Sequence, residues 1–152
     1  MRPTRLSGKL VLLALAFVLS TAFLAAADDY IALLSAPQEV PDNTSNAIGV
    51  FTATYDKTTN LLHFELTFIG LEGGETAAHI HGPAEKGKTA PVLFGFVNPG
   101  EYELGSPKVG FVGPFTEEER DLLDRGLLYV NVHSMLAPGG EIRGNIYRVA
   151  RR

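Results

Sequence analysis

The chain of 152 residues contains no cysteine, and this absence excludes several kinds of protein. Without cysteine there is no disulfide framework and no lipid-modified cysteine near the N-terminus. A cysteine nucleophile is excluded too, and the G-x-S-x-G motif of a serine hydrolase does not occur in the sequence. Stability must therefore come from packing alone, and an enzymatic activity, above all a hydrolytic one, is not favoured.

Long hydrophobic runs are also scarce, because the only one is an uncharged segment of 18 residues from Leu10 to Ala27. Three basic residues come before it, and three alanines end it, Ala25 to Ala27. This order is typical of a secretory signal peptide, so residues 1–27 are expected to be removed. The expected product is a secreted, periplasmic or extracellular domain without a membrane segment. The alternative is an uncleaved anchor, since an uncharged run of 18 residues can just span a bilayer.

Basic residues are few in the expected mature chain, residues 28–152. The signal segment carries three of the 13 lysines and arginines and none of the 17 acidic residues, which leaves a net charge of −7. Nucleic acid and anionic membranes are therefore not expected as partners. The remaining 125 residues are enough for one domain with an apolar core.

Short runs with alternating polarity dominate this domain. In residues 61–69 four apolar side chains alternate with polar ones, which predicts a strand with one buried face. Residues 48–55 precede it across five polar residues, so the two runs are expected to pair as a hairpin. Further strands are expected at 76–81, 92–97, 108–112, 127–133 and 141–149. The last two should form a hairpin whose polar residues share one surface.

One helix is predicted, over residues 117–125. Thr116 is followed three residues later by Glu119, as in a capping box, and Gly126 suits the position after the helix. About eight strands, one short helix and no internal repeat indicate an all-β fold, an antiparallel β-sandwich or barrel in a single domain over residues 28–152.

The sequence has four histidines, and three of them, His79, His81 and His133, lie on the polar side of the expected strands 76–81 and 127–133. His79 and His81 are two residues apart, so their side chains share one face of a strand. His133 ends the strand 127–133 on the side opposite to its apolar residues. Three imidazoles bind copper or zinc better than calcium or magnesium, which prefer oxygen. We therefore predict a metal site formed by His79, His81 and His133.

Other interpretations of the polar residues stay open. The histidines can instead hydrogen-bond the backbone of the loop 82–91 and hold it in place. Glu141 offers a fourth ligand or an acceptor for an imidazole N–H, and Arg143 offers a positive charge to an anion. The simpler interpretation is that these two form a cross-strand ion pair or bind Asn131. His63 is interpreted as a solvent-facing strand residue.

Three segments closely resemble the signatures of the CHRD domain, a family named from chordin. They are AHIHGPA at 78–84, YVNVHS at 129–134 and PGGEIRGNI at 138–146. The resemblance extends from about Tyr30 to Tyr147. It implies an extracellular module whose biochemical role is unsettled.

Two segments are also similar to those that supply copper ligands in copper-zinc superoxide dismutases. They are residues 66–71 leading into His79 and His81, and residues 126–133. This similarity implies a fold like that of superoxide dismutase or an immunoglobulin domain, with copper bound by His79, His81 and His133. The chain lacks a further histidine to bridge to zinc, a zinc-ligand cluster and that family's cysteine, so it implies a copper-only site at most.

Three functional hypotheses follow for a secreted CHRD-domain protein. The first is metal binding through the three histidines, with copper favoured and zinc as the alternative. The second is a structural or interaction module without metal, whose partner is an extracellular or envelope protein. The third is a copper-only enzyme similar to superoxide dismutase, which is the least supported because zinc ligands are absent and the net charge of residues 28–152 is −7.

Overall fold

The computed structural model describes residues 27–96 and 104–150, so residues 1–26 of the predicted signal peptide lie outside the described part. The strands are β1 (Asp28–Ser35), β2 (Ile48–Asp56), β3 (Leu61–Ile69), β4 (Glu75–His81), β5 (Val92–Gly95), β6 (Lys108–Val112), β7 (Tyr129–Ser134), β8 (Ile142–Asn145) and β9 (Tyr147–Arg148). The helices are the 3-10 turn η1 (Ala36–Gln38) and α1 (Glu117–Asp124). The predicted all-β class with one short α-helix is confirmed. Neither of these described helices has the length and apolar character needed to cross a membrane.

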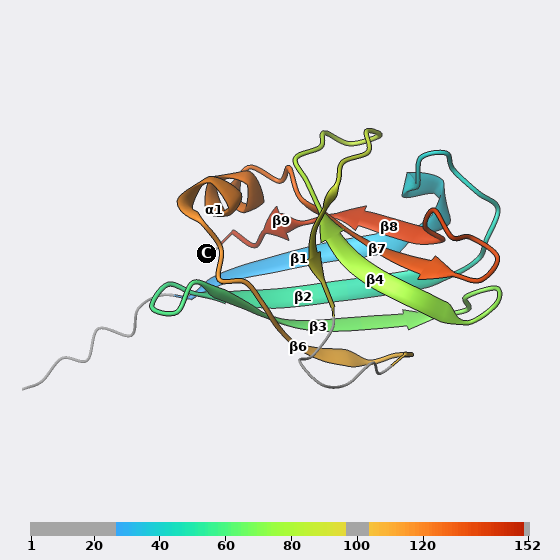
Figure 1. The fold of residues 1–152 in the computed structure, drawn as a ribbon, viewed down its shortest axis with the longest axis horizontal. Coiled ribbons are helices and arrows are strands. Elements are labelled where there is room, and N and C mark those ends of the chain that lie inside the picture. Colours follow the sequence, from blue (N-terminus) through green and yellow to red (C-terminus); the bar gives the residue numbers. More distant parts are fainter. Residues whose placement is uncertain (1–26, 97–103, 151–152) are drawn as a thin grey trace, which may run out of the picture.

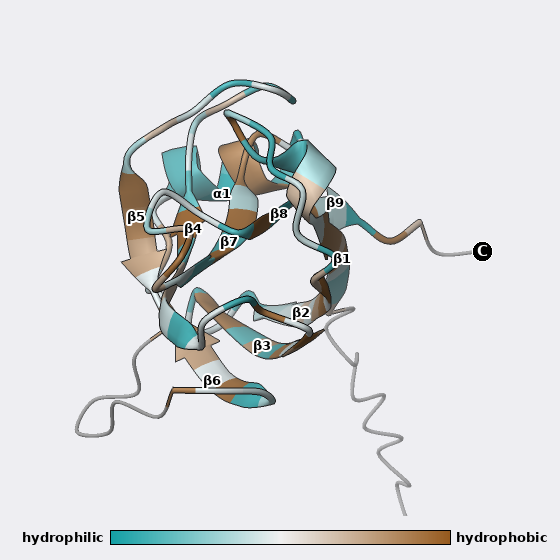
Figure 2. Cartoon of the chain, turned by 90° about the vertical axis from the view of Figure 1, so that its right-hand side faces the viewer, coloured by the Kyte–Doolittle hydropathy of each residue, from teal (hydrophilic) through white to brown (hydrophobic). Residues whose placement is uncertain are grey.

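All strand pairs in the described part are antiparallel and join into one sheet, in the order β5-β4-β7-β8-β1-β2-β3-β6, with β9 beside β1. Figure 2 shows the sheet curling round, so that β4, β7 and β8 lie across the interior from β2 and β3. Both predicted hairpins are present, β2 with β3 and β7 with β8. Strand β1, which the sequence pattern did not predict, lies between them in the sheet (Figure 1).

The interior is filled by the side chains on one face of each strand. In β3 the buried and exposed positions alternate as the sequence predicted, with Leu62, Phe64, Leu66 and Phe68 inside. The Phe64 ring packs against Phe96 at a centroid distance of 4.4 Å. Because burial of each such side chain contributes about 1.5–3 kcal/mol, this core can stabilise a domain without disulfides.

Helix α1 begins at the predicted capping box. The Glu119 backbone N–H donates to Thr116 Oγ1 at 3.2 Å, and the Thr116 backbone N–H donates to Glu119 Oε2 at 2.8 Å. The helix buries Leu123 and is held to β1 through Tyr30, whose hydroxyl donates to Asp124 at 2.6 Å. Local capping and a single apolar side therefore explain both the helix and its position.

The polar side of β7 and β8 differs from the expected surface. Asn131 and Arg143 face each other across the two strands, as predicted, yet they are only 3% and 1% exposed. The segment 36–47, which follows β1, lies against this side of the sheet, where Glu39 contacts Asn131 and Gly140. It is held there by Ser45, whose hydroxyl donates to Glu141 Oε1 at 2.6 Å, and by Asn43, whose amide donates to the Glu141 carbonyl at 3.0 Å. The domain therefore has a second, polar interior on this side of the sheet.

Candidate metal centre

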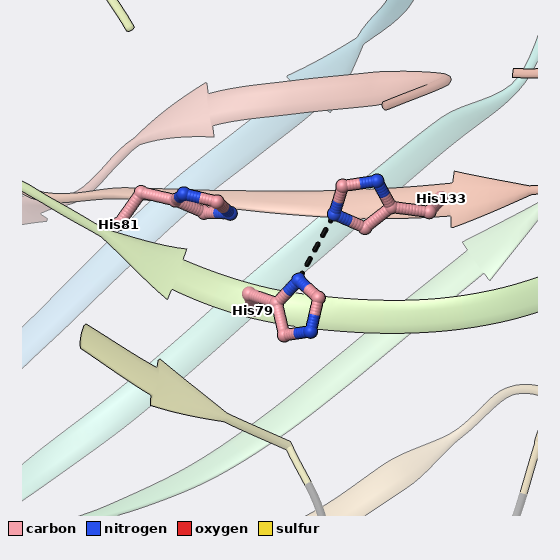
Figure 3. Close-up of side chains that lie close together, drawn as sticks. All are labelled: His79, His81 and His133. Atoms are coloured by element: carbon pink, nitrogen blue, oxygen red, sulfur yellow. Dashed lines mark hydrogen bonds between the residues drawn. The ribbon is translucent and has the colours of Figure 1, made fainter. Parts of the chain in front are cut away.

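Strands β4 and β7 bring the three predicted histidines together. In the antiparallel pair, His79 lies opposite Asn131 and Ala77 lies opposite His133, so His79 and His133 are diagonal neighbours on one face. His81 is two residues further along β4 on the same face. One ring nitrogen from each histidine lies within 4.8 Å of the others (Figure 3). His63, in contrast, is exposed on β3 beside Phe111, as the sequence indicated.

The spacing of the ring nitrogens is close to that of a metal site. His79 Nδ1 and His133 Nε2 are 3.0 Å apart. Two nitrogen ligands bound at about 2.0 Å to one ion are separated by at most about 4 Å. The largest separation in the cluster, up to 4.8 Å, therefore needs to shrink by less than about 1 Å, which small side-chain rotations supply.

Backbone carbonyls fix the orientation of two of the rings. His81 Nδ1 donates to the Ala90 carbonyl at 3.0 Å, and His133 Nδ1 donates to the Pro138 carbonyl at 2.9 Å. Since a carbonyl only accepts, each Nδ1 carries the proton. His133 Nε2 therefore accepts from His79 Nδ1 at 3.0 Å, whereas the lone pair of His81 Nε2 stays free. His81 Nε2 is buried and has no hydrogen-bond partner. Metal-binding histidines in proteins are commonly oriented by such an outer hydrogen bond.

The three rings are held neutral. Burial lowers the pKa of His79 to about 4, with a further contribution from His133 and His81. Burial also lowers the pKa of His81 and of His133, although the carbonyl acceptors oppose it. Near neutral pH the rings are therefore uncharged, as ligation by imidazole requires, and a bound ion would replace the hydrogen bond between His79 and His133.

Tyr129 connects this cluster to a buried cation. The His81 and Tyr129 rings are parallel within 4° at a centroid distance of 4.9 Å. On the same tyrosine, the Arg143 guanidinium carbon lies 3.5 Å from the ring centroid. Because β7 lies between β4 and β8, His81 and Arg143 approach Tyr129 from opposite sides. Nothing in the alternating pattern of the sequence distinguished Tyr129 from an ordinary strand residue.

Glu141 has a structural role that the sequence analysis did not identify. Among the described residues it belongs neither to the histidine cluster nor to an ion pair with Arg143, so the structure has neither the suggested fourth ligand nor the suggested cross-strand ion pair. Its Oε1 accepts from Ser45 Oγ and from the Glu72 backbone N–H, the latter at 2.8 Å. Burial alone would raise its pKa, but hydrogen bonds from Ser134, Ser45 and Glu72 lower it. Glu141 therefore holds two distant loops as a buried carboxylate.

Glu39 completes the polar interior, and no motif in the sequence marked it. Glu39 is 7% exposed, and burial raises the pKa of its carboxyl group to about 7, an effect that the charge of Arg143 only partly offsets. It packs over Gly140, where an added Cβ would lie 2.4 Å from Glu39 Oε1. Gly140 also has a φ of +128°, so both the contact and the backbone require glycine there.

Comparison with known proteins identifies a family that this chain matches and one curated relative. The family described as "CHRD domain" matches residues 30–146. Among curated proteins, "Chordin" of Xenopus laevis is 36% identical over 94 residues, which covers 57% of this chain and 10% of that protein. The chain thus spans about a tenth of the length of this relative. No solved structure matches it.

Proposed function

Because the chain belongs to the CHRD-domain family, we propose that it is an exported CHRD module that binds a metal ion, preferably copper, through His79, His81 and His133. The predicted signal peptide and the relationship to chordin support export. Zinc is the alternative ion. A role in storing, delivering or sequestering the ion fits a cluster that consists of three imidazoles among the described residues.

One observation carries this proposal, the inward-facing lone pairs of the cluster. The Ala90 and Pro138 carbonyls bind the Nδ1 atoms of His81 and His133, and this turns both Nε2 atoms towards His79. A buried lone pair without a partner, as on His81 Nε2, is costly unless something binds it. The cluster is made of imidazoles alone, which favours copper or zinc over calcium or magnesium.

A second candidate rests on the same carbonyl contacts. The bond from His81 to Ala90 braces the loop 82–91, and the bond from His133 to Pro138 braces the turn after β7. In this case the domain is a structural module that binds an extracellular or envelope protein without metal. It leaves the free Nε2 of His81 unexplained, so we rank it second.

The two candidates are separated by titrating the purified, metal-free exported protein with copper and with zinc in a calorimeter. We expect one ion per chain, with affinity reduced at least about tenfold in His79→Ala and in His133→Ala. His63→Ala, on the exposed side of β3, is the matched control and should bind normally. Binding that both cluster variants retain in full would disprove the three-histidine site and favour the bracing role.

A further inference from the structure

Resting on the proposed function, we infer that the site selects the cuprous ion over the cupric ion, and that Arg143 is the positioning residue that sets this preference through Tyr129. The charge of the surroundings, in addition to the identity of the three ligands, decides how much charge the bound ion can carry.

The first observation is that the ligand set brings no negative charge. The cluster in the described part of the chain consists of His79, His81 and His133, and no carboxylate belongs to it. Neutral ligands leave the whole charge of the ion uncompensated. In a partly buried site the cost of a charge rises steeply with its size, so a singly charged ion costs less than a doubly charged one.

The second observation is the buried guanidinium on the far side of Tyr129. Arg143 is 1% exposed, and its Nη1 and Nη2 have no hydrogen-bond partner. No carboxylate of residues 27–96 or 104–150 lies within 4.0 Å of it. Its guanidinium carbon lies 3.5 Å from the centroid of the Tyr129 ring, whose face offers a cation–π contact. Its positive charge is therefore only weakly compensated by its surroundings.

The acidic residues near Arg143 compensate this charge only in part, because neither forms an ion pair with it among the described residues. The Glu141 carboxylate accepts instead from Ser45 Oγ and from the Glu72 backbone N–H. Glu39 faces Asn131 and Gly140, and its burial favours the neutral carboxyl group. A net positive potential is therefore expected on the side of Tyr129 that faces His81.

The charge of Arg143 lies close enough to the metal position to affect a bound ion. The guanidinium lies 3.5 Å from the Tyr129 centroid, and that ring lies 4.9 Å from the His81 ring. This puts the cation on the order of 10 Å from an ion bound at His81 Nε2. Coulomb's law at an effective dielectric constant of about 20 then gives roughly a tenfold penalty for each extra positive charge on the ion. The same penalty applies to zinc, which is always a dication.

The test compares both oxidation states on the unaltered exported protein. Cuprous affinity is measured under anaerobic reducing conditions against a cuprous chelator, and cupric affinity in air against a cupric chelator, at the same pH. We expect the cuprous dissociation constant to be at least about tenfold lower than the cupric one. Cupric binding that is equal or tighter would overturn the inference and leave the proposed metal site standing, whereas no binding of either ion would refute the proposed function.

Arg143→Gln then tests the origin of the preference. We expect it to reduce the ratio of cuprous to cupric affinity about tenfold, which equals 59 mV for one electron. Arg148→Gln is the matched control, since Arg148 on β9 is half exposed and paired with Asp28. Arg143→Lys, which keeps the charge, should restore most of the ratio. An unchanged ratio in a folded Arg143→Gln protein would exclude Arg143 as the origin of the preference. If that variant does not fold, the comparison on the unaltered protein still tests the preference itself.

Discussion

Replacing Glu39 by glutamine should change how the stability of this domain depends on pH. Glu39 belongs to the segment 36–47, and its side chain is buried against Asn131 and Gly140. Burial raises the pKa of its carboxyl group from 4.5 to about 7. The folded protein therefore holds a proton on Glu39 at pH values where the unfolded chain has released it. Glutamine keeps the shape of the protonated acid and cannot ionise.

The sign and size of the effect follow from linkage. Because the folded pKa lies above the unfolded one, the stabilisation is complete below about pH 4.5 and is lost as the pH rises through 7. A shift of one pKa unit corresponds to about 1.4 kcal/mol, so the shift on Glu39 corresponds to a loss on the order of 3 kcal/mol at pH 8. Glu39→Gln should escape this loss and become the more stable protein at high pH.

Urea unfolding at pH 4.5, 6 and 8 measures this directly. The quantity to compare is the difference in unfolding free energy between Glu39→Gln and the unaltered protein, because the contributions of all other titrating groups cancel in it. Glu65→Gln, on the exposed face of β3, should show no such trend. A difference for Glu39→Gln that stays constant from pH 4.5 to pH 8 would refute the raised pKa and the burial that causes it.

Three shorter predictions concern the rest of the buried polar network. Asp28 is paired with Lys57, Arg120 and Arg148. Burial raises the pKa of its carboxyl group, but the hydrogen bonds and charges of Lys57 and Arg148 outweigh this and lower the pKa to about 2. Asp28→Asn should therefore be less stable at pH 7, and urea titrations should not show the loss of stability that the unaltered protein undergoes between pH 3.8 and 2. Glu141→Gln should lower the unfolding free energy by about 1.5–3 kcal/mol, because Ser45 and the Glu72 backbone lose a charged acceptor. Limited proteolysis should then cut the segment 36–47 faster than in the unaltered protein, and equal cleavage rates would contradict this. The metal-free protein should lose stability as the pH falls from 6.5 towards 4, because the histidines of the unfolded chain bind protons that the buried cluster does not. Denaturant titration should show a smaller loss in the variant with alanine at all three histidines.

Much of the fold was predictable because local patterns agree with it. The alternation of Phe64 and Leu66 with polar residues marks β3, and Thr116 with Glu119 marks the start of α1. Strand β1 was not predicted because its exposed positions include Ile31 and Leu33, which are as apolar as the buried residues that alternate with them. A strand that is apolar on both faces has no alternation to detect.

The three histidines were predictable for the same reason, since strand parity alone puts them on one face. Their surroundings were not. Asn131 and Arg143 are polar and alternate with apolar residues, so the pattern predicted a solvated surface. What buries them is the segment 36–47, which has no periodicity and returns from about 100 positions earlier in the chain through Ser45 and Glu141. Contacts of that kind depend on the tertiary fold and leave no local signal in the sequence.

The most direct measurement is the anomalous diffraction of copper in crystals of the metal-loaded protein. The account predicts one peak per chain at bonding distance, about 2.0 Å, from the Nε2 atoms of His81 and His133 and from a ring nitrogen of His79. The bonds from His81 to Ala90 and from His133 to Pro138 should be unchanged. A peak elsewhere, or none between β4 and β7 at saturating copper, would contradict the central claim.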